Sequence, residues 1–352
     1  MRVLHVSNFV QRHKGRLFWN HAFKISNGFI RNGHSVYNFS DRDISKINLI
    51  NKFNNEKNTN IDLITTFKNY NPDLLVIGHA DKIHNITILK LKKINPNLKI
   101  IEWNVDNYLL DNTENKLKHR SEVVDHIFIT NGDEKISSAA INKTTISFFP
   151  NVFDISIENK KIFEIKNYDK DLFFALSHGV GRGILKKNKS INSNDASLFR
   201  ENVMYSIKEK LPMLRTNFFG IGNIHPVWGA DFEKELSRSP MSLNLSRVPH
   251  LKYYSSDRLS QYLGNGSAVF IDYKSNLNDL FNNDEAIFYS SNDELIKKID
   301  YYSKNINKVK TIASNGWKRG HNNYNEKIVT KYMLDKVFNK NINISWPEIS
   351  YY

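Results

Sequence analysis

The first 150 residues alternate short apolar runs with segments in which apolar residues recur every three or four positions. The runs predict strands, and the recurring segments predict helices between them. Strands separated by such helices favour parallel pairing through right-handed crossovers, and hence a doubly wound, Rossmann-like sheet. The predicted strands span residues 3–6, 35–39, 73–77, 99–103, 126–130 and 145–149, and the predicted helices span residues 18–32, 61–70, 85–94, 114–124 and 133–141.

The pattern breaks at a polar, lysine-rich stretch over residues 151–169 and then resumes. Because 352 residues are many for one core, we expect two α/β domains joined near residue 160. The expected parts are a first domain over 1–158, a second over 165–325, and a C-terminal helix and tail over 326–352 that cross back to the first. Further strands are predicted at 172–176, 216–219, 242–245, 268–271 and 286–289, and further helices at 197–209, 229–238, 257–264, 293–304, 306–320 and 325–338.

The chain is basic, with 50 lysines and arginines against 36 acidic residues and a formal net charge of +14. Such an excess attracts polyanions. However, the basic residues are spread along the chain and no nucleic-acid recognition module appears, so no nucleic-acid partner is expected. A solvated surface explains the charge, and attraction to an anionic membrane face or acceptor is the alternative.

No run of 18 apolar residues predicts a membrane span, and the start MRVLHVSNFV has the pattern of a buried strand instead of a signal peptide. We therefore expect a cytoplasmic protein, with the inner face of the plasma membrane as a second location. The sequence has no cysteine, and its histidines lack the spacing with acidic partners that a metal site needs. No metal is expected.

The segment from Tyr253 to Asp272, YYSSDRLSQYLGNGSAVFID, predicts a helix that ends at Asn265-Gly266 before a strand. A helix start presents unpaired N–H groups and about half a positive charge, which suits a phosphate. Nearby cations at Arg247, Lys252 and Arg258 would add to the attraction. The segment therefore indicates a phosphorylated ligand, most simply a nucleotide.

Ligands of open parallel sheets bind at the carboxyl ends of the strands. The loop after the first strand carries His13, a candidate general base, and Arg16, a candidate anion ligand, although an exposed polar loop is the alternative. The fourth strand ends in EWNVDN, where Trp103 and Asn104 offer stacking and hydrogen bonds to a sugar. Asp106 is a second candidate base, and turn capping is its alternative role.

Two loops in the second half have nucleotide-binding character. SHGVGRGILKKNK at 177–189 combines glycines with Arg182 and Lys187, which suits a diphosphate, although a surface loop is the alternative and the Walker spacing is missing. In FFGIGNIHPVWG at 218–229, Gly220 would let a base pack on backbone amides, and His225 would reach a phosphate unless it is merely structural.

The order of NFFGIGNIHPVWG, SPMSLNLSRVPHLKYYSSDRLSQYLGNGSAVFID and IASNGWKRG resembles that of GT-B glycosyltransferases. The likeness is strongest to the group-1-like branch that includes the CgeB-type proteins. The first half resembles the same family through RVLHVSN, RLFWNHAFKISNGFIRNGHSV and EWNVDN, so the resemblance covers nearly the whole chain. It implies two Rossmann-like domains facing a central cleft. It also implies sugar transfer from a nucleotide donor, held by the C-terminal domain, to an acceptor held mainly by the N-terminal one.

Candidate residues follow from the resemblance and from the loops together. By resemblance, Arg182 and Lys187 bind the diphosphate, Gly220 belongs to the base pocket, and the segment 254–257 contacts ribose or phosphate. Many retaining members carry two glutamates seven residues apart near this helix, whereas Asp257 and Gly264 stand here, so the stereochemistry stays open. The full set is Arg182, Lys187, Gly220, His225, Arg247, Tyr254, Ser255, Ser256, Asp257 and Arg258 for the donor, Arg16, Trp103 and Asn104 for the acceptor, and Asp106 or His13 as the base.

We therefore expect a metal-independent glycosyltransferase that needs no cofactor beyond its UDP- or GDP-linked sugar. The expected acceptor is a saccharide or lipid-linked intermediate of surface polysaccharide or lipopolysaccharide synthesis. A non-catalytic nucleotide- or sugar-binding protein is the first alternative. A nucleic-acid-binding protein, with steeply salt-dependent affinity, is the second.

Overall fold

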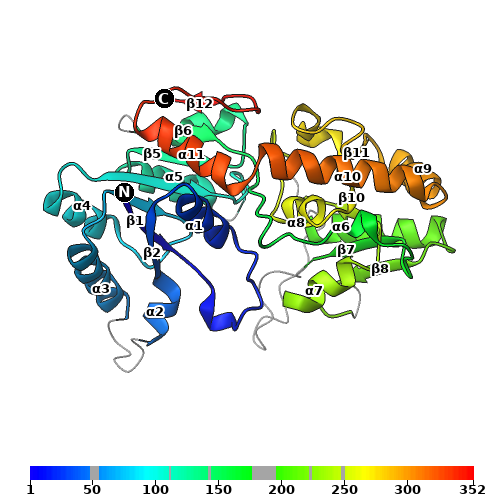
Figure 1. The fold of residues 1–352 in the computed structure, drawn as a ribbon, viewed down its shortest axis with the longest axis horizontal. Helices are drawn as coiled ribbons and strands as arrows, with labels where there is room; N and C mark the ends of the chain where they lie inside the picture. Colours follow the sequence, from blue (N-terminus) through cyan, green and yellow to red (C-terminus); the bar gives the residue numbers. More distant parts are fainter. Residues whose placement is uncertain (48–54, 111, 142–143, 177–195, 222–223, 247–249) are drawn as a thin grey trace. The chain divides into compact units, whose positions relative to one another are not determined.

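The computed structural model describes residues 1–47, 55–110, 112–141, 144–176, 196–221, 224–246 and 250–352 (Figure 1). The chain forms two compact units. Unit 1 comprises Met1–Glu158, Leu251–Asp257 and His321–Tyr352, and unit 2 comprises Asn159–His250 and Arg258–Gly320. Each unit is built on one largely parallel sheet, which is the Rossmann-like α/β arrangement expected from the alternating pattern.

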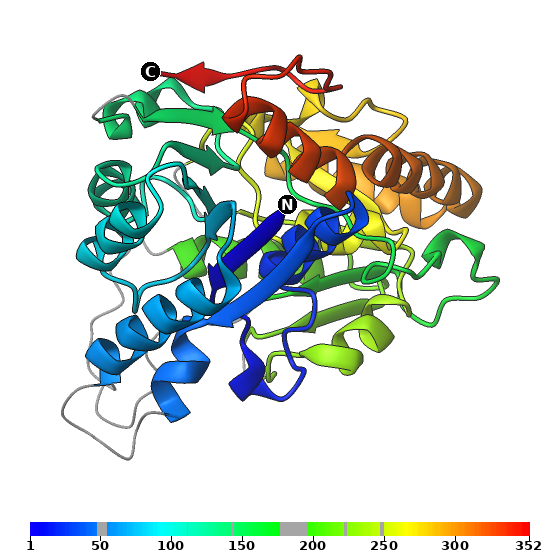
Figure 2. The same ribbon diagram turned by 60° about the vertical axis from the view of Figure 1, so that its left-hand side comes forward.

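Unit 1 contains a seven-stranded sheet in the order β12-β6-β5-β4-β3-β1-β2. Figure 2 shows the C-terminal strand of this sheet in red, at the end of the chain marked C. The pairings of the sheet are parallel except for that of β12 with β6, by which the C-terminal tail joins the sheet. The strands are β1 (Arg2–Ser7), β2 (Ser35–Ser40), β3 (Leu74–Ile77), β4 (Lys99–Asn104), β5 (His126–Ile129), β6 (Thr145–Phe148) and β12 (Ser350–Tyr351). The α-helices are α1 (His21–Arg31), α2 (Asp41–Ile47), α3 (Asn55–Tyr70), α4 (Asn85–Ile94), α5 (Thr113–Ser121) and α11 (Glu326–Val337).

Local sequence explains the bounds of these elements. The β3 run LLVI is buried along its whole length, as is typical of a central parallel strand. Helix α1 begins later than residue 18, because the Asn20 side chain accepts a hydrogen bond from the Ala22 N–H at 2.8 Å and caps the helix there. The helix predicted over 133–141 is a 3-10 helix over Glu134–Ala139. Helix α2 has no counterpart among the predicted elements.

Unit 2 contains a five-stranded parallel sheet in the order β11-β10-β9-β7-β8. The α8 helix, which follows β9 and precedes β10 in the chain, packs on these two strands and is buried from Leu259 to Gly264. The strands are β7 (Leu172–Ala175), β8 (Thr216–Phe219), β9 (Met241–Asn244), β10 (Ala268–Asp272) and β11 (Ile287–Tyr289). The α-helices are α6 (Ala196–Lys210), α7 (Gly229–Leu236), α8 (Arg258–Gly264), α9 (Asn292–Ser303) and α10 (Ile306–Asn323), whose last residues belong to unit 1.

Residues 251–257, which the sequence places in the second domain, belong to unit 1. We call this segment the strap. The Gly132 N–H donates to the carbonyl of Lys252 at 2.8 Å, and the Tyr253 ring lies 5.0 Å from that of Phe148. The Asn151 side chain donates to two further carbonyls of the strap, at Ser255 and Ser256. These contacts fix the strap to unit 1. The second domain expected over 165–325 is therefore interrupted by a segment that belongs to unit 1.

Gly220 joins the ends of β7 and β8 at close range. It has a φ of +77°, and a Cβ there would lie 1.8 Å from the carbonyl oxygen of Leu176. We expect Gly220→Ala to lower the free energy of unfolding by at least about 2 kcal/mol, through steric overlap added to backbone strain. Gly33→Ala is the control, because Gly33 also has a positive φ but no atom within 4 Å of its Cβ position. Equal losses for both variants in denaturant titrations would contradict the close approach.

Candidate functional site

The carboxyl edge of the unit 1 sheet brings His79 and Asp106 together. His79 follows β3 and Asp106 follows β4, and these strands are neighbours. Oδ2 of Asp106 lies 3.6 Å from Nδ1 of His79, and the two side chains are 44% and 27% exposed. A partly exposed carboxylate beside an imidazole at this edge has the composition of a proton-transfer site. The sequence prediction included Asp106 but missed His79. The only indication of His79 in the sequence is that it stands two residues after the end of a strand.

The loop after β1 is held by Asp43 of α2. The Asp43 carboxylate accepts the backbone N–H groups of Gln11 at 2.9 Å and Arg12 at 3.0 Å, and the Arg12 guanidinium lies 3.2 Å away. Burial opposes the ionised form, but these hydrogen bonds and one from Ser40 lower the pKa of Asp43. Asp43 therefore has a structural role in building this loop.

His13 and Arg16 lie on the loop that Asp43 holds. Burial and the neighbouring positive charge of Arg12 lower the pKa of His13, which favours the neutral imidazole that a base requires. Arg16 is exposed and has no ion-pair partner among the described residues. Both side chains are thus available to a ligand of unit 1.

Trp103 and Asn104 are corrections to the predicted acceptor site. Trp103 is 1% exposed, its Nε1–H donates to Nε2 of His5 at 2.9 Å, and its ring occupies the space that a side chain at Gly78 would fill. Neither face of the indole is open to a sugar. Asn104 is 6% exposed, and Oδ1 of its side chain accepts the Asp106 N–H at 2.8 Å. Asn104 therefore shapes the turn that carries Asp106, which was the alternative role for such a residue.

The strap residues predicted to touch the donor are mostly engaged within unit 1. Tyr254 packs in the apolar core of unit 1, and Ser255 is 1% exposed. Ser256 differs, because its Oγ is buried and has no hydrogen-bond partner in the described part of the chain. Of these three side chains, Ser256 has the polar atom best suited to a ligand.

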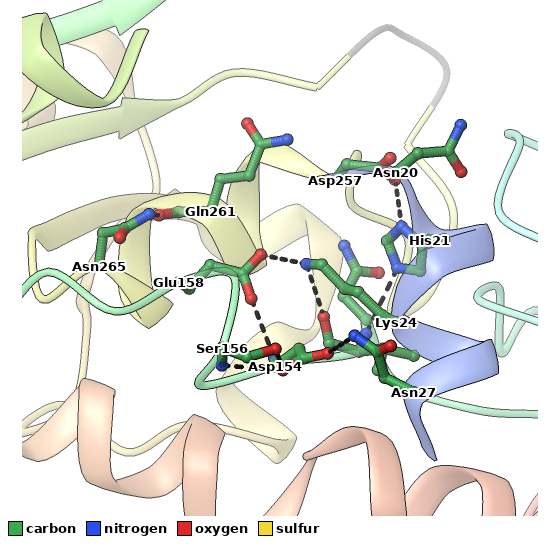
Figure 3. A network of polar contacts seen from close by, with 12 residues as sticks. Asn20, His21, Lys24, Asn27, Asp154, Ser156, Glu158, Asp257, Gln261 and Asn265 are labelled. Carbon is green, nitrogen blue, oxygen red and sulfur yellow. Dashed lines mark hydrogen bonds and ion pairs between the residues drawn. The ribbon is translucent and has the colours of Figure 1, made fainter. Parts of the chain in front are cut away.

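Asp257 ends the strap and pairs with His21 of α1 (Figure 3). Its Oδ1 lies 3.0 Å from Nδ1 of His21, while Nε2 of His21 accepts the Val152 N–H at 3.4 Å. This second bond places the ring proton on Nδ1, facing the carboxylate. Burial disfavours the charge on Asp257, but His21 outweighs it and lowers the pKa of Asp257 to about 2. An ionised carboxylate repels phosphate and accepts hydrogen bonds from hydroxyl groups, so of the two predicted contacts the Asp257 side chain favours the ribose.

One turn further along α1, Lys24 forms a buried ion pair with Glu158 (Figure 3). The side chains are 0% and 1% exposed. Lys24 also donates to the carbonyl of Val152 at 3.0 Å, and the second carboxylate oxygen of Glu158 accepts the Asp154 N–H at 2.9 Å. Burial raises the pKa of Glu158 to about 7, and the ammonium of Lys24 opposes this rise. The pair fixes α1 to the end of the first chain segment of unit 1, Met1–Glu158.

Asp154 extends this network toward α11. It accepts hydrogen bonds of 2.7 Å from Asn27 and Ser156, which Figure 3 labels, and from Arg31. Arg31 also donates to Glu326 at 2.6 Å. The sequence analysis found none of these partners, because they are far apart in the chain and no local pattern connects them. The network fixes helix α1, which follows the loop that carries His13 and Arg16.

In unit 2, a small pocket opens at the carboxyl ends of β9 and β10, where nucleotides bind in open parallel sheets. Nε2 of His250 lies 3.7 Å from Oδ2 of Asp272 within it. Burial lowers the pKa of His250, and the Asp272 carboxylate opposes this shift. The lining residues are Phe199, Asn244, Leu245, Ser246, His250, Ile271, Asp272, Ser275 and Tyr289. The sequence analysis did not select this histidine.

Of the remaining predicted donor residues, the structure describes some and not others. Gly220 ends β8 at the same sheet edge, and His225 is exposed on the loop that follows. The Arg258 guanidinium donates to the carbonyl of Leu245 at 2.7 Å and lies 5.4 Å from the centre of the Phe174 ring, so it has structural partners. Arg182, Lys187 and Arg247 lie outside the described residues.

No group of three or more potential metal ligands of the His, Cys, Asp or Glu type gathers among the described residues. No described helix combines the length and the apolar character required to cross a bilayer.

The chain is similar in fold to solved structures, and one part of its sequence matches a protein family. Residues 200–335 match the family described as glycosyl transferase-like. HepE of Anabaena, in complex with UDP-glucose, is 14% identical with a TM-score of 0.56, over 96% of this chain and 100% of HepE. Sucrose-phosphate synthase of Thermosynechococcus elongatus is 8% identical with a TM-score of 0.54, over 96% of this chain and 98% of the synthase.

The apo structure of OtsA is similar to the same extent, at 11% identity and a TM-score of 0.56 over 96% of this chain and 99% of OtsA. A search of curated protein sequences found no match. The two Rossmann-like units, the structural neighbours and the matched domain agree with one another. The chain therefore has the GT-B fold, and its residues 200–335 form a glycosyl transferase-like domain.

Proposed function

We propose that the protein transfers a sugar from a nucleoside diphosphate bound by unit 2 to an acceptor bound by unit 1. The observation that carries this proposal is the glycosyl transferase-like match over 200–335, which contains the pocket beside His250 and Asp272. HepE, which has the same fold, was solved with UDP-glucose and with UDP. This supports a UDP-linked donor, with a GDP-linked donor as the alternative.

On the donor side, Arg182, Lys187 and Arg247 are the proposed diphosphate ligands. Cations near the leaving group stabilise the negative charge that develops as the glycosidic bond breaks, and no metal is needed for this. Ser256, with its unpartnered Oγ, is the strap residue proposed to contact the donor. Gly220 and His225 are proposed to border the base and the phosphates.

On the acceptor side, Asp106 or His13 is the proposed base, and Arg16 is the proposed ligand for an acidic acceptor. We favour Asp106 over His13 because the imidazole of His79 lies close to its carboxylate, with 3.6 Å between Nδ1 and Oδ2. A small movement would bring the two groups into a hydrogen bond that holds the carboxylate in one orientation. The proposed acceptor is a saccharide or lipid-linked intermediate of surface polysaccharide or lipopolysaccharide synthesis, met at the inner face of the membrane. The basic net charge supports an acidic partner of this kind.

Thermal unfolding in the presence of UDP, GDP, CMP and their sugars tests the donor. A nucleotide that binds only the folded chain, at a hundred times its Kd, adds about 2.7 kcal/mol to stability and raises the Tm. We expect one diphosphate nucleotide to do so, with the matching nucleoside as a control that lacks phosphates. If no nucleotide raises the Tm, the proposal fails. If one binds but no donor sugar is ever released or transferred, the non-catalytic alternative is correct.

A further inference from the structure

Helix α4 exposes an unusual face. Its residues 86, 89, 90, 93 and 94 follow the spacing of one helical stripe, and all five are exposed. Three of them are large aliphatic residues: Ile86 is 59% exposed, Leu89 is 43% exposed and Ile94 is 45% exposed. The other two, Lys90 and Lys93, have no ion-pair or hydrogen-bond partner in the described part of the chain. The helix contains no acidic residue.

The exposure does not result from loose packing of α4. Its opposite face is buried, with Ile88 and Leu91 at 0% exposure. On one side Asn60 of α3 accepts hydrogen bonds from the His84 N–H at 3.0 Å and from Thr87 at 2.6 Å. On the other side the Asn85 side chain donates to the carbonyl of His119 in α5 at 2.7 Å. The helix is thus fixed on three sides and presents its fourth side to the surroundings.

The neighbouring helix α3 presents a similar stripe. Lys57, Ile61, Thr65 and Lys68 are exposed at successive turns, and Ile61 is 50% exposed. The exposed stripes of the two helices therefore combine lysines with aliphatic side chains. The exposed carboxylate of Glu56 lies beside Lys57 at the start of α3 and pairs with Lys82. We call the two stripes together the α3–α4 face.

We infer that the α3–α4 face docks onto an anionic phospholipid bilayer. Aliphatic side chains on such a helix enter the boundary between head groups and acyl chains, while the lysines meet the lipid phosphates. A second copy of the chain is a poorer occupant, because a symmetric dimer through this face would set lysines against lysines. Nucleic acid explains the lysines but not the aliphatic residues. The inference rests on the proposed function, since a lipid-linked acceptor is presented at a membrane surface.

Flotation of the full chain with lipid vesicles tests this inference. We expect binding to vesicles that contain phosphatidylglycerol and little binding to pure phosphatidylcholine. The double variants Ile86→Gln/Leu89→Gln and Lys90→Gln/Lys93→Gln should each lower the vesicle partition coefficient at least about tenfold. The control Lys297→Gln/Lys318→Gln removes the same charge from exposed positions of unit 2 and should bind as the wild type does.

Three results would overturn the inference. The first is that the wild type does not bind anionic vesicles. The second is that the control variant loses as much vesicle binding as the α4 variants, which would indicate unspecific electrostatic attraction. The third is a dimer in sedimentation velocity that the α4 variants dissociate, which would assign the face to a second copy. Nucleotide binding, measured on the same variants by thermal shift, should not change. It separates a failure of this inference from a failure of the proposed function.

Discussion

Asp106→Asn should lower the turnover of donor and acceptor by about 10²- to 10⁴-fold, if Asp106 removes the acceptor proton. The amide keeps the shape of the side chain but accepts no proton, so the loss appears in the reaction and not in folding. Donor affinity should stay at the wild-type value, because Asp106 is a proposed acceptor-side residue and is not among the proposed ligands of the donor. Release of nucleoside diphosphate in the presence of acceptor measures the turnover.

Asp125→Asn is the matched control for this variant. Asp125 is a partly exposed carboxylate that precedes β5, at the amino end of the same sheet, and it should have no effect on turnover. Wild-type turnover of Asp106→Asn would remove Asp106 as the base and leave His13, whose replacement by Gln would then be the decisive variant. Loss of nucleotide binding in Asp106→Asn would show that the side chain acts on the donor instead.

Regular elements with a strong local pattern were predictable from the sequence. Helix α4 and strand β8 have the bounds that their patterns predict, since Pro96 follows the helix and a buried run defines the strand. Helix α2 was not predictable in the same way. It is short and polar, and its two buried aspartates bind backbone groups of other segments, namely the loop at Gln11 and the residue Lys82. Its stability comes from tertiary contacts that leave no periodic signal.

The candidate site was predictable only to the level of the sheet edge. Asp106 and His79 meet because β3 and β4 are neighbours, and strand order is not written in the local pattern. Trp103 was predicted to face a ligand because it lies near a strand end, yet Gly78, directly after the adjacent strand β3, leaves the space in which the indole is buried. That outcome depends on the register between two strands. Side-chain roles at a strand end therefore need the neighbouring strand to be known.

The strap shows the same limit at the level of domains. A helix pattern starting at Asp257 is visible in the sequence, and α8 is found there. What the pattern does not contain is the partner of Asp257, because His21 belongs to a helix near the other end of the chain. The chain thus enters unit 1 for seven residues, Leu251–Asp257, between two parts of unit 2. Contacts between distant segments decide this, and composition does not.

The buried ion pair of Lys24 and Glu158 should give the largest stability effect in unit 1. Lys24→Met leaves a buried carboxyl without its counter-charge, which costs about 3–5 kcal/mol. The double variant Lys24→Met/Glu158→Leu should recover most of that loss, since an apolar pair of similar volume often replaces a buried ion pair at little cost. Lys118→Met removes the partly exposed pair with Glu114 and, as the control, should cost about 0.5 kcal/mol or less.

The loss in Lys24→Met should also depend on pH in a defined direction. Burial already raises the pKa of Glu158 to about 7, and removing the Lys24 ammonium raises it further. A carboxyl whose pKa is higher in the folded chain than in the unfolded chain binds its proton preferentially when folded. Below the pKa of the unfolded chain, Glu158 is protonated in both states and its burial carries no charge penalty. As the pH rises above that pKa, the free energy of unfolding falls. Denaturant titrations at pH 5 and about pH 8 should show the larger loss at the higher pH, and a loss that is independent of pH would mean that Glu158 finds another cation.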